Sequence, residues 1–209
     1  MLYLIIALTV LISIKGFKDH SFFNKYKFNI SSVKNGEKYR MFSSAFLHVD
    51  FNHLFFNLFT LLVFSNQILN ELGSLYYIII YIVSLYFGNY YTFKQYKNNG
   101  FYSAVGASGA VSGIVYSAIL LFPEMKLVFI LFPIPLPSYI FGIGYILYSI
   151  YGMKKLDDNI GHSAHLGGAI SGIIITILIK PSIIVSQTWL IFLLILPFII
   201  ERFIKNNHF

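Results

Sequence analysis

Long apolar stretches separated by short polar ones form the main pattern along the chain. They cover residues 1–17, 46–70, 75–93, 104–122, 138–152, 161–180 and 184–203. These lengths approach the roughly 20 residues that a helix needs to cross a hydrocarbon core of about 30 Å. Because no long-period repeat and no separable soluble domain interrupts them, the pattern predicts an all-α fold: one polytopic transmembrane helix bundle over residues 1–209.

The links between these stretches predict where helices end. Gly73 and Ser74 form a turn between the second and third stretches, and Pro123 ends the fourth. The first stretch has no basic segment before it and no Ala-x-Ala-like site after it, so we expect a retained helix rather than a signal peptide. Before the fifth stretch we expect an irregular or extended segment, because three prolines exclude a regular helix there: Pro133, Pro135 and Pro137.

Composition supports a membrane location. Hydrophobic residues make up 57% of the chain and charged residues 11%, and the mean hydropathy is +0.72, which leaves too little polar surface for a soluble globule. The absence of cysteine excludes disulfides, thiol nucleophiles and thiolate zinc sites. The net charge of +7 is better explained by contact with anionic headgroups of the lipid bilayer than by nucleic-acid binding.

A serine surrounded by small residues is the first candidate for chemistry. Ser108 lies between Gly106-Ala107 and Gly109-Ala110, so a ligand can approach its hydroxyl closely, as a nucleophile requires. The alternative is a packing role, because Gly109 and Gly113 form a small-xxx-small pattern that lets two helices approach. This stretch alone leaves both interpretations open.

Polar side chains within the apolar stretches supply further candidates. His53 and Asn57 are four residues apart and therefore share one helix face, where they serve as two donors to one point or as an interhelical hydrogen bond. His165 precedes Gly168 and Gly172, a second small-residue repeat. If this repeat packs on the one that follows Ser108, the His165 imidazole can accept the hydroxyl proton at neutral pH.

Four motifs then occur in one order along the chain. They are Tyr39-Arg40, His48 with His53 and Asn57, Gly106-Ala107-Ser108-Gly109, and Ala164-His165-Leu166-Gly167-Gly168. On these residues the chain resembles the rhomboid family of intramembrane serine proteases, of the bacterial type with six core helices and one C-terminal helix. Tyr39 stands where the family usually has Trp.

The resemblance implies a catalytic dyad without cofactor or metal. Ser108 would be the nucleophile and His165 the general base, and no carboxylate is evident as a third member, because Asp157 and Asp158 lie in a charged loop. Ser108, Gly106, His53 and Asn57 would surround the oxyanion. The resemblance implies supporting roles for five further residues: Arg40, His48, Gly109, Gly168 and Gly172.

Three features depart from the family or stay open. Many members carry an aromatic residue four positions after the nucleophile, where it stacks on the catalytic imidazole, but this chain has Ser112 there. His165 must therefore be oriented in another way. We expect His162 to be a polar residue at the helix mouth rather than part of a water entry. The resemblance implies a mobile loop over the cavity, which would be residues 154–160.

The expected function is cleavage of transmembrane segments of other membrane proteins by an integral, multi-pass protein of a bacterial cell membrane. One alternative is a catalytically inactive rhomboid-like protein that binds transmembrane helices. Another is a transporter or metal-binding protein, in which the imidazoles would converge without Ser108: His48, His53, His162 and His165.

The family resemblance and the distribution of positive charge predict opposite membrane orientations. The family implies a cytoplasmic N-terminus, which places all of the 15 lysines and arginines except Lys126 and Lys180 on the extracytoplasmic side. The positive-inside rule favours the opposite orientation. We keep the family orientation as the expectation, with the first loop's cations acting as lipid anchors.

Overall fold

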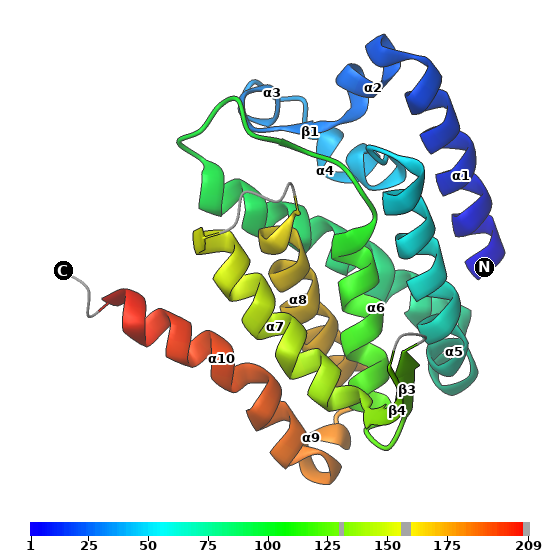
Figure 1. Ribbon diagram of the computed structural model, residues 1–209, viewed down its shortest axis with the longest axis vertical. Coiled ribbons are helices and arrows are strands. Elements are labelled where there is room, and N and C mark those ends of the chain that lie inside the picture. The colour runs from blue at the N-terminus through cyan, green and yellow to red at the C-terminus, as the bar shows by residue number, and fades with distance from the viewer. Residues whose placement is uncertain (130–131, 156–159, 207–209) are drawn as a thin grey trace.

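The computed structural model describes residues 1–129, 132–155 and 160–206, most of which are helical (Figure 1). The longer helices are α1 (Leu2–Lys18), α5 (Phe51–Tyr96), α6 (Ser108–Leu121), α7 (Ser138–Lys155), α8 (His162–Ile179) and α10 (Thr188–Asn206). Short ones are α2 (His20–Tyr26), α3 (Ile30–Lys34), α4 (Arg40–Ser43), the 3-10 helix Ser44–Phe46 and α9 (Ile183–Ser186). By length and composition, α5 and α8 are long and apolar enough to cross a membrane.

Helix α5 contains the second and third apolar stretches as two rods joined at Gly73. The backbone there leaves the helical region, with φ 81° and ψ 172°. Glycine adopts such a positive φ without a steric penalty, whereas a residue with a Cβ does not. The turn predicted at Gly73 is therefore present as a kink that separates the two rods of α5.

Several helix boundaries differ from the ranges that hydropathy predicts. The second helix begins at Phe51 rather than near residue 46, because the Asp50 carboxylate accepts the His53 N–H at 2.7 Å and caps the helix. The fourth begins at Ser108 rather than 104, since Ser103–Ala104 form a strand. The last apolar stretch is divided into α9 and α10 at Gln187.

Two small antiparallel strand pairs accompany the helices. Strand β1 (Phe28–Asn29) pairs with β2 (Ser103–Ala104) and joins the first loop to the segment before α6. Strands β3 (Lys126–Phe129) and β4 (Phe132–Pro137) form the second pair. The proline-rich segment, predicted to be irregular or extended, is thus an extended strand in a two-stranded ladder, where proline N–H groups are not needed on the open edge.

The core forms where α5, α6 and α8 meet at glycines. A methyl group on Gly88 of α5 would lie 2.8 Å from the Ala164 carbonyl oxygen of α8 and 3.2 Å from Cα of Gly109 in α6. Further along, a methyl on Gly168 would collide with the Gly109 carbonyl, and one on Gly172 with the Gly113 carbonyl. The two small-residue repeats therefore face each other in backbone contact.

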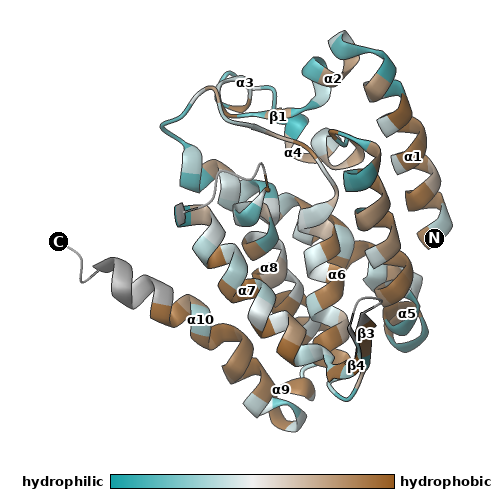
Figure 2. Cartoon of the chain, viewed as in Figure 1, coloured by the Kyte–Doolittle hydropathy of each residue, from teal (hydrophilic) through white to brown (hydrophobic). Residues whose placement is uncertain are grey.

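Hydrophobic side chains also cover much of the outside of the bundle. Figure 2 shows hydrophobic residues along α1 and α10 and hydrophilic residues gathered near α2. Large exposed apolar side chains include Phe55, Phe56 and Phe59 on α5, and Leu178 on α8. Such a surface is costly in water and favourable in lipid, which agrees with the predicted transmembrane bundle.

Candidate active site

The predicted site residues gather at one end of the bundle, where α5, α6 and α8 all begin (Figure 1). A cavity of about 1370 Å³ lies there, and its lining includes four of them: His53, Asn57, Ser108 and His165. A space of this size can hold water and an extended peptide segment. The four side chains come from three different helices, so only the packing of those helices brings them to one cavity.

Ser108 is the first residue of α6 and is half-buried. The N–H groups in the first turn of a helix have no acceptor within that helix and carry its positive dipole end. A negative charge that develops beside Ser108 is therefore met by oriented donors. The position combines an accessible hydroxyl with an anion-stabilising helix terminus.

Contact between α6 and α8 brings His165 to the same cavity. A methyl group on Gly109, the residue after Ser108, would lie 3.4 Å from the carbonyl oxygen of Ala164, the residue before His165. The His165 side chain is 6% exposed. The small residues at these positions thus set the distance between the two helix starts, as the small-residue repeats predict.

Gly106 and His53 are in direct contact. Gly106 has φ 122°, and a methyl group on it would lie 2.6 Å from Cε1 of His53. The missing side chain leaves the imidazole lying against the backbone that precedes Ser108. One turn along α5, the Asn57 Nδ2 donates to the His53 carbonyl oxygen at 2.9 Å, and its side chain is 6% exposed.

His48 holds the same loop through a hydrogen bond to its backbone. Its Nε2 accepts the Ala107 N–H at 3.4 Å, and its Nδ1 lies 2.9 Å from the Ser13 hydroxyl of α1. Burial lowers the pKa of His48 to about 3, so the ring is neutral at physiological pH and can accept that N–H. His48 thereby connects α1 to the residue that precedes Ser108.

Tyr145 of α7 is a contact of His165 that the motifs do not reveal. Its hydroxyl oxygen lies 2.7 Å from Nδ1 of His165, and the two rings stack with centroids 5.5 Å apart at 26°. Ser112 lines the same cavity but is too short to stack on the imidazole. A sequence signal does exist, because Phe141, Tyr145 and Tyr148 share one helix face.

Comparison with known proteins decides the family. The model of the rhomboid domain matches residues 35–182, which include every motif above. The chain belongs to the rhomboid family. It is therefore an integral, multi-pass membrane protein with a polytopic helical fold.

The rhomboid relatives are distant. RHOMBOID-like protein 12, mitochondrial, of Arabidopsis thaliana is 29% identical over 73% of this chain and 50% of its own length. The human presenilin-associated rhomboid-like protein, mitochondrial, is 31% identical over 64% of this chain and 36% of its own. The putative rhomboid protease YdcA of Bacillus subtilis is 35% identical over 43% of this chain and 45% of its own. The chain thus spans about half or less of these relatives.

The first loop of this rhomboid is organised around Arg40, which is 7% exposed. Its guanidinium donates to the carbonyl oxygens of Asn24 and Lys27 at 2.8 Å each and pairs with the Glu37 carboxylate at 2.7 Å. The Glu37 carboxylate also accepts the Tyr39 hydroxyl at 2.9 Å. Both hydrogen bonds lower the pKa of Glu37, and the one from Arg40 has the larger effect.

His162 lies at the start of α8, as predicted, but is buried there. It is 3% exposed and packs against α7, where its ring contacts Tyr148 edge to face at 5.1 Å and a methyl on Gly152 would collide with it. It is therefore a buried polar residue at the start of α8, packed against α7. Asp157, Asp158 and the centre of the expected 154–160 loop lie outside the described residues.

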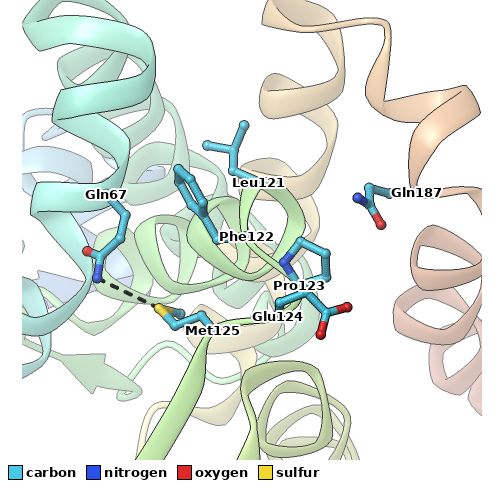
Figure 3. Close-up of a pocket in the computed structure, with 7 residues that line it drawn as sticks. All are labelled: Gln67, Leu121, Phe122, Pro123, Glu124, Met125 and Gln187. Atoms are coloured by element: carbon cyan, nitrogen blue, oxygen red, sulfur yellow. Dashed lines mark hydrogen bonds between the residues drawn. The ribbon is translucent and has the colours of Figure 1, made fainter.

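No group of three or more histidines and acidic residues suited to a metal ion occurs within the described ranges. The imidazoles instead form two pairs, His48 with His53 at 4.8 Å and His162 with His165 at 6.2 Å between ring centroids. A second cavity of about 520 Å³ adjoins the end of α6 and is lined by Gln67, Leu121, Phe122, Pro123, Glu124, Met125 and Gln187 (Figure 3). None of the described residues that line it is a serine or a histidine.

Proposed function

We propose that this rhomboid is an intramembrane serine endopeptidase that cleaves transmembrane segments of other membrane proteins. The observation that carries the proposal is that Ser108 and His165 line one cavity from the first turns of two helices in backbone contact. Ser108 is the nucleophile and His165 the general base. The related bacterial chain is itself described as a putative rhomboid protease, which supports the same activity.

The proposed reaction has two steps. The Ser108 Oγ attacks the scissile carbonyl carbon while Nε2 of His165 takes the hydroxyl proton. The resulting imidazolium then gives this proton to the leaving amine as the C–N bond breaks, which leaves an acyl ester on Ser108. Water, deprotonated by His165, attacks the ester, and collapse of the second tetrahedral intermediate returns the proton to Ser108.

The oxyanion of each intermediate would lie among donors at the start of α6. The Ser108 N–H, the His53 ring and the second N–H of the Asn57 amide are the candidates, and Gly106 gives the substrate carbonyl room beside them. Loss of one such donor costs on the order of 3 kcal/mol, or a hundredfold in rate. His48 acts indirectly, because it holds the Ala107 N–H.

A substrate must unwind before it reaches Ser108. The carbonyls of a membrane helix are hydrogen-bonded within the helix, so the scissile bond becomes accessible only in a locally unwound segment. We therefore expect substrates with small or helix-weakening residues near the cleaved bond.

Cleavage of a model transmembrane substrate by purified protein in detergent tests the proposal. We expect cleavage by the wild type, none above background by Ser108→Ala, and no inhibition by 1,10-phenanthroline. Ser112→Ala is the matched control, since Ser112 lines the same cavity one turn along α6. Cleavage that persists in Ser108→Ala would refute the proposed site. Helix binding without Ser108-dependent cleavage would favour the inactive rhomboid-like alternative.

We also propose the six-plus-one helix arrangement, with α10 as the additional C-terminal helix, in a bacterial cell membrane with a cytoplasmic N-terminus. The match to a Bacillus subtilis relative supports the bacterial location, whereas the Arabidopsis and human relatives are mitochondrial proteins. A topology reporter fused after Phe209 tests the arrangement. Extracytoplasmic reporter activity is expected, and cytoplasmic activity would contradict either the seventh span or the orientation.

A further inference from the structure

The orientation of His165 depends on a helix that carries neither dyad residue. Tyr145 belongs to α7, and its hydroxyl oxygen lies 2.7 Å from Nδ1 of His165. The phenol ring also stacks on the imidazole, with an interplanar angle of 26°. A stacked ring limits tilting of the imidazole, and a hydrogen bond to one nitrogen limits its rotation in plane. Together the two contacts fix where the other nitrogen, Nε2, points.

We propose that Tyr145 is a positioning residue for the general base, and that His165 Nδ1–H donates to its phenol oxygen. This inference rests on the proposed function. A base that takes the Ser108 proton through Nε2 needs a lone pair there, so the single ring proton must be at Nδ1. Tyr145 stabilises that tautomer as an acceptor, and it keeps accepting when the imidazolium forms. A carboxylate has this task in a catalytic triad.

The position of α7 itself is fixed on both sides of Tyr145. Three residues before it, the Gly142 carbonyl oxygen accepts the Tyr116 hydroxyl of α6 at 2.6 Å. Seven residues after it, Gly152 leaves room for the His162 ring of α8. These contacts set the height of α7 against α6 and α8. A shift of α7 along or away from the bundle would therefore move the phenol from the imidazole.

Removal of the phenol oxygen alone tests the proposal. In Tyr145→Phe the ring and its stacking stay, and only the acceptor is lost. Loss of a partner that orients a metal-bound imidazole costs on the order of 10- to 100-fold, and we take the same factor for this imidazole. We expect kcat to fall by about that factor with KM changed less than about twofold, and labelling of Ser108 by a fluorophosphonate to slow equally. The thermal unfolding midpoint should fall only slightly, because a single buried hydrogen bond is lost.

Tyr148→Phe is the matched control. Tyr148 lies on the same helix face, one turn along α7, and its ring meets His162 edge to face. The Tyr148→Phe variant should cleave substrate, and be labelled at Ser108, at the rate of the wild type. Equal labelling rates of Tyr145→Phe and wild type would overturn the positioning role while the protease stands. A wild type that shows no Ser108-dependent labelling would instead refute the proposed function.

The tautomer can be measured without activity. In protein labelled with ¹⁵N at histidine, the ring signals absent from His165→Gln belong to His165. The proposal expects a protonated Nδ1 in the wild type and a shift toward protonated Nε2 in Tyr145→Phe. A wild-type His165 protonated at Nε2 would overturn it, whatever the catalytic result.

Discussion

Between α6 and α8 backbone lies against backbone, whereas between α7 and α8 the contact is made by rings. Gly168 and Gly172 leave no room for even a methyl group beside the carbonyls of α6. On the other side, Tyr145 and Tyr148 of α7 meet His165 and His162 through stacked and edge-on aromatic contacts. The glycine interface sets the separation of the two helices. The aromatic interface sets the direction of one imidazole.

The difference has a physical reason. Closely packed interiors resist any change of volume, so backbone contact fixes a distance that no single side-chain rotation can alter. A ring held by one hydrogen bond and one stacking contact can reorient when its partner is lost. We therefore expect substitutions at the glycine interface to destabilise the fold. Substitutions in the side-chain contacts should leave the protein folded and change its activity or the order of one loop.

The largest effect is expected for Gly168→Leu. The new side chain would collide with the Gly109 carbonyl and push α8 away from α6. Overpacking typically costs about 1–3 kcal/mol and occasionally more, and a leucine side chain pressed on a main-chain carbonyl belongs at the upper end. Thermal unfolding in detergent measures it. Gly144→Leu is the control, because nothing lies within 4 Å of a methyl at that position. Equal midpoints for the two variants would contradict the close contact.

A smaller loss of stability and a large loss of activity are expected for Gly106→Ala. The methyl would displace the His53 ring, so we expect a fall in kcat of about 100-fold, the cost of losing one oxyanion donor. A positive φ alone costs an alanine about 1–3 kcal/mol. Gly36→Ala separates the two effects, since Gly36 has φ 99° and no atom within 4 Å of its added methyl. It should lose similar stability and keep full activity. Similar kcat values for the two variants would remove His53 from the proposed oxyanion site.

Sequence patterns predict the backbone part of this comparison well. Small residues at 109, 113, 168 and 172 favour a close contact between two helices, and the helices do meet at these positions. The helix starts were less predictable from hydropathy. Pairing of Ser103–Ala104 with β1 and the Asp50 cap depend on partners far along the chain or on local polar geometry.

The side-chain part could not be derived from the motifs. Tyr145 is 20 residues from His165, and nothing in the spacing shows that α7 turns this residue, rather than Tyr148, toward Nδ1. The absence of an aromatic at Ser112 only shows that some other group must orient the ring. The burial of His162 could not be predicted either. It depends on Gly152, which leaves room for the His162 ring only because α7 and α8 are in contact.

The smallest expected effect is a pH response confined to the first loop, which side-chain contacts hold together. Hydrogen bonds from Arg40 and Tyr39 lower the pKa of Glu37 below that of the unfolded chain, about 4.3. A depressed carboxyl pKa stabilises the fold above the unfolded pKa, and this stabilisation is lost as pH falls through the folded pKa. As the pH falls below about 4.3 and through the folded pKa, the loop should therefore loosen, because protonated Glu37 no longer pairs with Arg40, whereas the interface glycines have no side chain that titrates.

Hydrogen exchange can separate the two regions. Amides of residues 24–43 should exchange faster, relative to intrinsic rates, at a pH low enough to protonate Glu37 than at pH 6, and those at the α6–α8 interface should not. In Glu37→Gln the loop's protection should be nearly independent of pH over this range, because the titrating group is gone. A wild-type loop that keeps its protection after Glu37 has become protonated would show that the two main-chain hydrogen bonds of Arg40, rather than its ion pair, hold the first loop.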